Sequence, residues 1–266
     1  MRLRARFWLI TLISLVFLPL LACQIKDKDL FESGLQAFKK GDFDSAIGFF
    51  SQLNEKFPHS PYVEKSVFQL AEIYYKYTKD QEKAIEHYSQ LIHLYPTSDL
   101  VCLARKNVAD IYVEKYREYE KAIEEYQKFS IQCSDPAHRA YAQKRISDCY
   151  FRAGHYHQAI IEYALFMDSF SDSPLKRDAL KKIADCYYIQ GDMVQAEINY
   201  RKFLKLYPDE NSKDEVTLNL ATVLKNQGQN CLALEIYQTF LTQNPDRKDI
   251  MKILTVVSEL CDSKGK

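Results

Sequence analysis

Hydrophobic and polar positions recur along this chain at two distances at once. Within short segments the apolar residues return every three or four positions, which predicts amphipathic helices. Over longer distances alanine recurs six times, at spacings of 38, 38, 37, 37 and 37 residues: Ala46, Ala84, Ala122, Ala159, Ala196 and Ala233. Four residues after each of these register alanines stands an aromatic residue: Phe50, Tyr88, Tyr126, Tyr163, Tyr200 and Tyr237. A repeat of this length predicts stacked helical units, none of which buries its apolar face alone.

One unit shows how the pattern predicts a pair of helices. Its two apolar stripes, 70–74 and 84–91, are separated by a polar stretch at 78–81, which indicates a helical hairpin. The first helix of every unit carries a small residue at one site: Gly34, Ala71, Ala109, Ser147, Ala184 and Ala221. A proline follows the register alanine by twelve residues in four units, where it ends the second helix: Pro58, Pro96, Pro208 and Pro245. Serine or threonine in the next loop, such as Ser60 or Ser98, is expected to cap the following helix.

This alternation of small and large residues resembles the tetratricopeptide (TPR) pattern over about residues 27–261. The resemblance implies an all-α fold: a right-handed α-solenoid of about six helical hairpins, closed by a C-terminal capping helix. We expect no internal linker. The expected repeats are about 27–60, 61–97, 98–135, 136–173, 174–210 and 211–245, followed by a cap at 246–261 and a tail at 262–266.

The repeats are longer than the usual TPR period of about 34 residues. Each unit has a lengthened start to its first helix, and units two and three carry one more residue before the register alanine. This variant resembles the repeats of BamD-type assembly lipoproteins of the outer membrane and those of the Tol-Pal-associated coordinator. BamD-type proteins usually have five repeats with an insertion, whereas six uninterrupted units stand here. The coordinator usually has a coiled coil, which this sequence lacks.

The first 22 residues are predicted to be a lipoprotein signal peptide. Arginines at positions 2, 4 and 6 precede an apolar run at 7–18, which is too short to span a membrane. The run ends in Leu20, Leu21, Ala22 and Cys23, which resembles the bacterial lipobox and implies lipidation of Cys23. Residues 23–26 would then form a short tether. The alternatives are an ordinary signal peptide or an uncleaved anchor.

Lipid on Cys23 predicts a location in the bacterial cell envelope. Three acyl chains exceed what stable membrane anchoring needs, so the membrane would be a partner through the lipid. By analogy with the sorting rule of enteric bacteria, Gln24 in place of aspartate favours the outer membrane, with the chain facing the periplasm.

Charge and composition exclude several other classes. Removal of residues 1–22 takes away three of the 36 basic residues and none of the 36 acidic ones, leaving a net charge of about −3. Nucleic acid is therefore not an expected partner, since a phosphate-binding surface needs concentrated basic charge. Only seven glycines are present, which argues against a Gly-lined nucleotide site.

Six cysteines follow Cys23, an even number in a compartment where disulfides persist. The start of a first helix lies beside the end of its antiparallel partner, which suggests two bridges: Cys102 with Cys133, and Cys231 with Cys261. Cys149 and Cys186 occupy the same site in successive units, too far apart to pair, and are expected to be buried thiols. No cysteine pair has the spacing of a zinc site, and we expect no metal or other cofactor.

The resemblance to TPR proteins implies that the first helices line a concave binding face. Three lysine and aspartate pairs repeat along it: Lys106 with Asp110, Lys144 with Asp148, and Lys181 with Asp185. The other candidate groove residues are Lys65, Phe68, Glu72, Tyr75, Lys76, Glu114, Tyr141, Phe151, Arg152 and Tyr188. Aromatic anchors between charges suit a peptide from another protein. The alternative is that each lysine and aspartate satisfy one another and the aromatics form core.

An enzyme is not expected, because the sequence has no phosphate loop, no GxSxG and no cysteine with a histidine partner. We predict a lipid-anchored periplasmic scaffold that binds other envelope proteins through its concave face, with outer-membrane β-barrel assembly as the specific setting. No small-molecule substrate is expected. Two alternatives stay open: a pilotin-like lipoprotein for secretin or pilus assembly, and an envelope enzyme or glycan-binding module.

Overall fold

The computed structural model describes residues 26–208 and 212–263, and these residues form helices joined by short loops without a strand. The helices make six antiparallel pairs, here called repeats 1 to 6, and a terminal helix. The pairs are α2 (Asp27–Lys40) with α3 (Phe43–Lys56), α4 (Val63–Ile73) and the π-helical turn η2 (Tyr74–Thr78) with α5 (Gln81–Leu94), α6 (Leu100–Ile111) and the π-helical turn η3 (Tyr112–Tyr116) with α7 (Tyr119–Gln132), α8 (Pro136–Arg152) with α9 (Tyr156–Ser169), α10 (Lys176–Ile189) with α11 (Met193–Leu206), and α12 (Lys213–Asn226) with α13 (Asn230–Gln243). The terminal helix is α14 (Lys248–Asp262).

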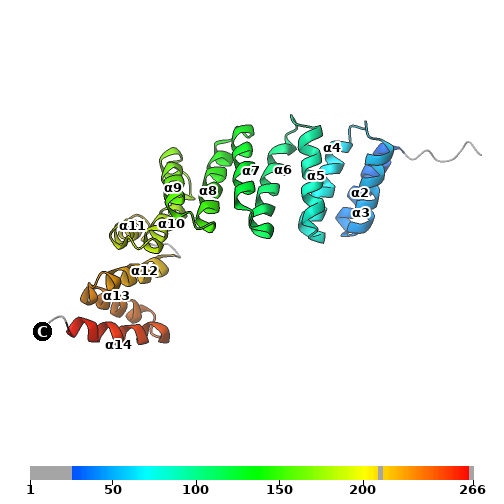
Figure 1. Ribbon diagram of the computed structural model, residues 1–266. Coiled ribbons are helices and arrows are strands. Elements are labelled where there is room, and N and C mark those ends of the chain that lie inside the picture. The colour runs from blue at the N-terminus through cyan, green and yellow to red at the C-terminus, as the bar shows by residue number, and fades with distance from the viewer. Residues whose placement is uncertain (1–25, 209–211, 264–266) are drawn as a thin grey trace, which may run out of the picture. The chain divides into compact units, whose positions relative to one another are not determined.

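The chain divides into two compact units, one ending at Ala104 and the other beginning at Arg105. The division falls inside α6 and not in a separate linker. Within the second unit each helix packs on the next along the chain, as the ribbon from α7 to α14 shows (Figure 1). The fold is an all-α stack of TPR-type hairpins, as the alanine register predicts.

The register alanines and their aromatic partners form the core of both units. All six alanines are fully buried, and the aromatic side chains four residues later are at most 1% exposed. Gly34 shows how tight this packing is, because a Cβ added there would lie 2.6 Å from the ring of Phe50. Burial of one large apolar side chain contributes about 1.5–3 kcal/mol, so this repeated contact stabilises every hairpin.

Each hairpin turns through a left-handed residue five positions before its register alanine. Glycine occupies this position in repeats 1, 4, 5 and 6, with φ between 77° and 83°. In repeats 2 and 3 it is Lys79 and Arg117, with φ of 58° and 57°. These two repeats carry the additional residue, and each ends its first helix in a π-helical turn, η2 or η3. The wider turn absorbs the extra residue, so the alanine keeps its place in the core.

Short polar side chains begin the helices in two ways. Asp42, Asp80 and Asp192 accept hydrogen bonds from the backbone N–H three residues later and so cap α3, α5 and α11. Ser98 accepts instead from the backbone N–H of Leu100, at 3.0 Å, in the loop before α6. The expectation that these loop serines cap the helix directly is wrong for Ser60, since the residue at the start of α4 is Tyr62, which has no side-chain cap.

The cysteines divide into bonded and free. Cys231 and Cys261 form a disulfide with a Cα–Cα distance of 4.9 Å, which joins α13 to the terminal helix. Cys102 and Cys133 are also disulfide-bonded. Cys149 and Cys186 are free and buried, and burial raises the pKa of each thiol to about 12. Cys23 lies outside the described residues.

Candidate functional site

A tyrosine and a carboxylate are paired in four of the repeats. The acid is the residue directly after the small residue of the first helix. The tyrosine stands four residues after the register alanine of the second helix. Tyr163 donates its hydroxyl to Asp148 at 2.6 Å, and Tyr200 donates to Asp185 at 2.7 Å. Tyr126 with Asp110 and Tyr88 with Glu72 make the same bond. Each acid therefore satisfies a buried hydroxyl, which would be costly to leave without a partner.

The remaining repeats vary this pair in a consistent way. In repeat 6 the acceptor position is Thr222, whose hydroxyl lies 3.1 Å from that of Tyr237. Repeat 1 has Phe50 in place of the tyrosine and Leu35 in place of the acid. Where the hydroxyl is missing, the carboxylate is missing too, so the acids serve the interior of the hairpin.

The lysines of the predicted ladder connect successive repeats. Lys144 Nζ lies 2.9 Å from Asp148 in its own helix and 2.5 Å from Asp178 in α10. Lys181 repeats the arrangement, at 3.3 Å from Asp185 and 2.8 Å from Glu215 in α12. Both lysine side chains are only 12–13% exposed. The ladder thus satisfies its own charges and stabilises the contact between repeats.

Lys106 of repeat 3 also contacts the next repeat, but through an aromatic ring in place of a second acid. Its ammonium lies 2.7 Å from Asp110 and 5.3 Å from the ring centre of Tyr141, which occupies the position of Asp178 one repeat earlier. A cation–π contact therefore replaces the second ion pair.

Arg145 stands at the centre of a polar cluster between repeats 3 and 4. Its guanidinium donates to the hydroxyl of Tyr126 at 2.9 Å, and to Asp110 and Glu114 at 3.3 Å each. Arg152 donates to the same Glu114 carboxylate at 3.1 Å. Burial opposes the charge on Arg145, but Tyr126 and Asp110 outweigh it and raise the pKa of the guanidinium. Burial likewise opposes ionisation of Glu114, but bonds from both arginines lower its pKa.

Arg145 was not among the residues predicted from the sequence, and the burial of its equivalent in repeat 3 explains its role. Asn107 is 3% exposed at the equivalent position of repeat 3, so this site faces the interior between repeats. A charged residue at an interior site implies a buried partner.

The candidate groove residues separate by accessibility. Phe68, Glu72 and Asp110 are buried, and Phe68 packs edge-on against Tyr88 with ring centres 6.0 Å apart. These three therefore belong to the interior, for the reason that the alternative interpretation gave. Half-buried are Tyr75, Lys106, Tyr141, Lys144, Asp148, Phe151, Lys181, Asp185 and Tyr188, while Lys65, Lys76, Glu114 and Arg152 are exposed.

Among the cavities of the second unit are two of about 560 and 450 Å³. One of about 560 Å³ is bounded by Tyr141 and Ala140 of α8 and by Phe170, Pro174 and Leu175 of the loop between α9 and α10. Its walls are mainly apolar, and it shares Tyr141 with the first-helix face.

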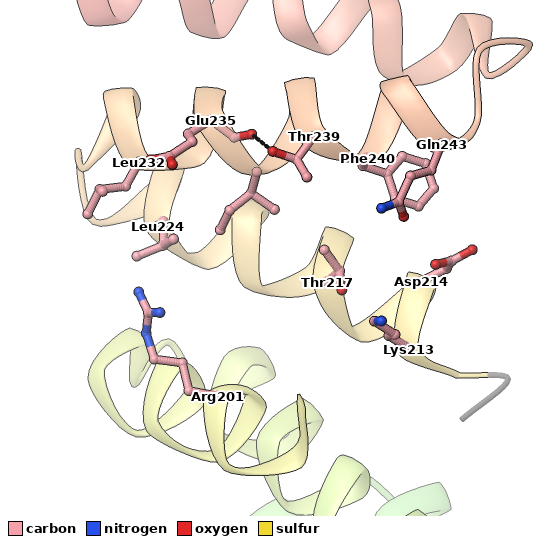
Figure 2. Close-up of a pocket in the computed structure, with 11 residues that line it drawn as sticks. Arg201, Lys213, Asp214, Thr217, Leu224, Leu232, Glu235, Thr239, Phe240 and Gln243 are labelled. Carbon is pink, nitrogen blue, oxygen red and sulfur yellow. Dashed lines mark hydrogen bonds between the residues drawn. The ribbon is translucent and has the colours of Figure 1, made fainter. Parts of the chain in front are cut away.

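The other cavity, of about 450 Å³, lies between α12 and α13 (Figure 2). Leu224 and Leu232 line one end, where Arg201 of α11 points towards them, and Lys213 and Asp214 lie at the other end. Thr239, which also lines the cavity, donates its hydroxyl to the backbone oxygen of Glu235 at 2.9 Å within α13.

Neither metal chemistry nor membrane insertion is visible in the described part of the chain. It contains no cluster of three metal-ligating side chains. Its helices are also too short or too polar to cross a membrane.

Paired helices that pack one on the next, with side chains exposed on their first helices, are the architecture of a helical-repeat scaffold. Residues 137–211 match a tetratricopeptide repeat family, and residues 23–130 match the YfiO outer membrane lipoprotein family. Both families consist of non-catalytic interaction scaffolds, and the second belongs to the cell envelope. TPR scaffolds generally bind protein partners.

Solved structures share the fold at low sequence identity. A tetratricopeptide repeat protein from Parabacteroides merdae has 19% identity and a TM-score of 0.58, covering 81% of this chain and 79% of its own. The C-terminal part of a TPR protein from Cytophaga hutchinsonii has 12% identity and a TM-score of 0.67, with coverage of 86% and 88%. PilW, described as a type IV pilus biogenesis factor, has 17% identity and a TM-score of 0.54, with coverage of 86% and 98%. No curated protein matches the sequence.

Proposed function

We propose that the mature protein is a lipid-anchored periplasmic scaffold that holds other envelope proteins near the outer membrane, in the setting of β-barrel protein assembly. The observation that carries this proposal is the match to the outer membrane lipoprotein family, which begins at Cys23 itself, directly after the predicted signal peptide. A lipid on that cysteine would tether the repeats to the bilayer.

The binding surface proposed for the partner is the first-helix face of repeats 4 and 5. Tyr141, Phe151 and Tyr188 are half-buried there, so each residue keeps part of its surface accessible. The ammonium of Lys182 lies 4.2 Å from the ring centre of Phe151, a cation–π contact that favours this orientation of the ring. Rigid aromatic anchors lose little entropy on binding.

The partner chemistry that suits this face is an extended segment with a large apolar side chain. The cavity of about 560 Å³ beside Tyr141 could receive that side chain. Arg152 and Glu114 are exposed next to the anchors and would set the register of a charged neighbour.

The pilotin-like role has weaker support. PilW shares the fold at 17% identity, which says nothing of a common partner, and the 37- to 38-residue period matches the lipoprotein variant better. No observation in the described residues favours an enzyme or a glycan-binding module.

Affinity purification of the full chain from detergent-solubilised envelopes tests the proposal. We expect the chain in the outer-membrane fraction, in complex with a β-barrel assembly protein, and release into the soluble periplasm after Cys23→Ala. The paired variant Phe151→Ala with Arg152→Glu should lose the partner and keep its membrane location. The control is Glu120→Arg, a charge reversal at an exposed position of α7. Recovery of a secretin, or full partner recovery with the paired variant, would contradict the proposal.

A further inference from the structure

The second helix of each repeat has an outward ridge of three positions, at two before, two after and six after the register alanine. In repeats 2 and 3 this ridge is charged or polar: Glu82, Glu86 and Gln90 in α5, and Glu120, Glu124 and Lys128 in α7. In repeats 4 and 5 it changes to His157, Ile161 and Leu165 in α9, and Val194, Ile198 and Lys202 in α11. The position two residues after the register alanine thus carries glutamate in repeats 2 and 3 and isoleucine in repeats 4 and 5.

Four aliphatic side chains on these two ridges face solvent. Ile161 is 46% exposed, Leu165 51%, Val194 61% and Ile198 52%. Single exposed aliphatic residues are common on proteins, but a cluster on neighbouring elements marks an interaction site. The two helices that carry these ridges, α9 and α11, both pack on α10. We call these four residues the outer apolar patch.

The hairpin does not need an isoleucine at this ridge position in order to fold, because other repeats have glutamate there. Repeats 2, 3 and 6 have Glu86, Glu124 and Glu235 at the position of Ile161 and Ile198, and their hairpins have the same form. The first-helix face and its cavity lie on other residues, so the patch is separate from the proposed binding surface.

Lys202, at the end of the second ridge, lacks the acid partner that its equivalent in α7 has. In α7, Lys128 pairs with Glu124 four residues earlier at 2.6 Å. In α11 the corresponding residue is Ile198, so Lys202 has lost that partner, and neither it nor Lys205 makes an ion pair within the described residues. Two exposed cations therefore border an exposed aliphatic surface, which is complementary to a segment with aliphatic and acidic side chains.

We propose that the outer apolar patch, with Lys202 and Lys205, binds an amphipathic helix of another envelope protein whose apolar face is flanked by acidic residues. The partner's aliphatic residues would cover the two ridges at helical spacing. Its carboxylates would pair with the two lysines and fix its direction. This makes the protein a scaffold with two binding faces, able to hold two partners at once.

The proposal is tested with two synthetic amphipathic helices that share a leucine face but carry either glutamate or lysine beside it. Binding to the full chain in amphipol is measured by fluorescence anisotropy. We expect the glutamate helix to bind about tenfold or more tightly than the lysine helix, and Lys202→Glu with Lys205→Glu to reverse that order. Ile161→Glu with Ile198→Glu should abolish binding of both. That variant should retain its helicity and melting temperature, because it carries residues that other repeats already have. Glu124→Gln on α7 is the matched control.

A photo-crosslinking residue at Ala164, exposed between the ridges' residues on α9, identifies the occupant in intact cells. A crosslink to an acidic amphipathic segment of another protein, lost in Ile161→Glu with Ile198→Glu, supports the proposal. Equal binding of the two helices, an unchanged crosslink in that variant, or crosslinks only to lipid or to a second copy of the chain would overturn it.

Discussion

The pairing of Tyr163 with Asp148 leads to a prediction about which interactions stabilise the hairpin. In Asp148→Leu the tyrosine hydroxyl stays buried and loses its acceptor, while Lys144 keeps its contact with Asp178 at 2.5 Å. A hydrogen bond to a charged group contributes about 1.5–3 kcal/mol, and a buried unpaired hydroxyl costs about as much. We expect Asp148→Leu to lower the free energy of unfolding of this hairpin by about 2–3 kcal/mol.

Repeat 1 provides the matched rescue, because it already has Phe50 and Leu35 at these two positions. The double variant Tyr163→Phe with Asp148→Leu removes both polar groups and should recover most of the loss, to within about 1 kcal/mol of the wild type. Repeat arrays need not unfold in one step. The assay is therefore hydrogen exchange of the α8 and α9 amides, read by mass spectrometry across a urea series. If the single and double variants are equally destabilised, with a coupling below about 0.5 kcal/mol, the carboxylate does not act through the hydroxyl.

Three further predictions concern the interior and the turns. Burial and the Asp148 carboxylate raise the pKa of Tyr163 above its ordinary value of 10.0, so its contribution to stability is complete below pH 10 and is lost as the pH rises further. Tyrosinate absorbance should therefore appear together with loss of helical circular dichroism; ionisation of all tyrosines before unfolding would contradict this. Cys149 and Cys186, with pKa raised by burial to about 12, should resist a thiol reagent at neutral pH until urea unfolds the chain, and labelling of the native protein would count against their burial. Lys79→Gly should raise stability by about 0.5–1 kcal/mol, because it relieves a left-handed lysine, and Gly191→Ala should lower it by about 1–2 kcal/mol; opposite signs in thermal melts would refute the turn geometry.

The sequence predicted the helices well because the signal is repeated. Each unit repeats the alanine and the aromatic residue that touch in the core, so the register places every hairpin to within a few residues. The cap, expected at 246–261, is the helix Lys248–Asp262. The π-helical turns could not be predicted, since an added residue can be absorbed in a loop or in a helix with the same local pattern.

The site was harder to predict, because helical spacing gives a face but not the depth of a side chain. Asp110 and Glu72 were predicted to face a groove, but both are buried and accept a hydrogen bond from the tyrosine that reaches across from the second helix. That contact joins residues 16 apart in the chain, and only comparison of all six units, with Phe50 and Leu35 as the exception, could have revealed it.

The two wide turns at Lys79 and Arg117 show where this architecture accepts length variation. A residue inserted before the left-handed position changes the local helix from α to π and leaves the phase of everything downstream intact. An insertion at this point would therefore leave the packing of the interior almost unchanged. An insertion a few residues later would rotate the second helix by about a quarter turn and expose its row of aromatic residues. Hairpin tips are thus the natural places to splice in tags, sensors or new loops without disturbing the neighbours.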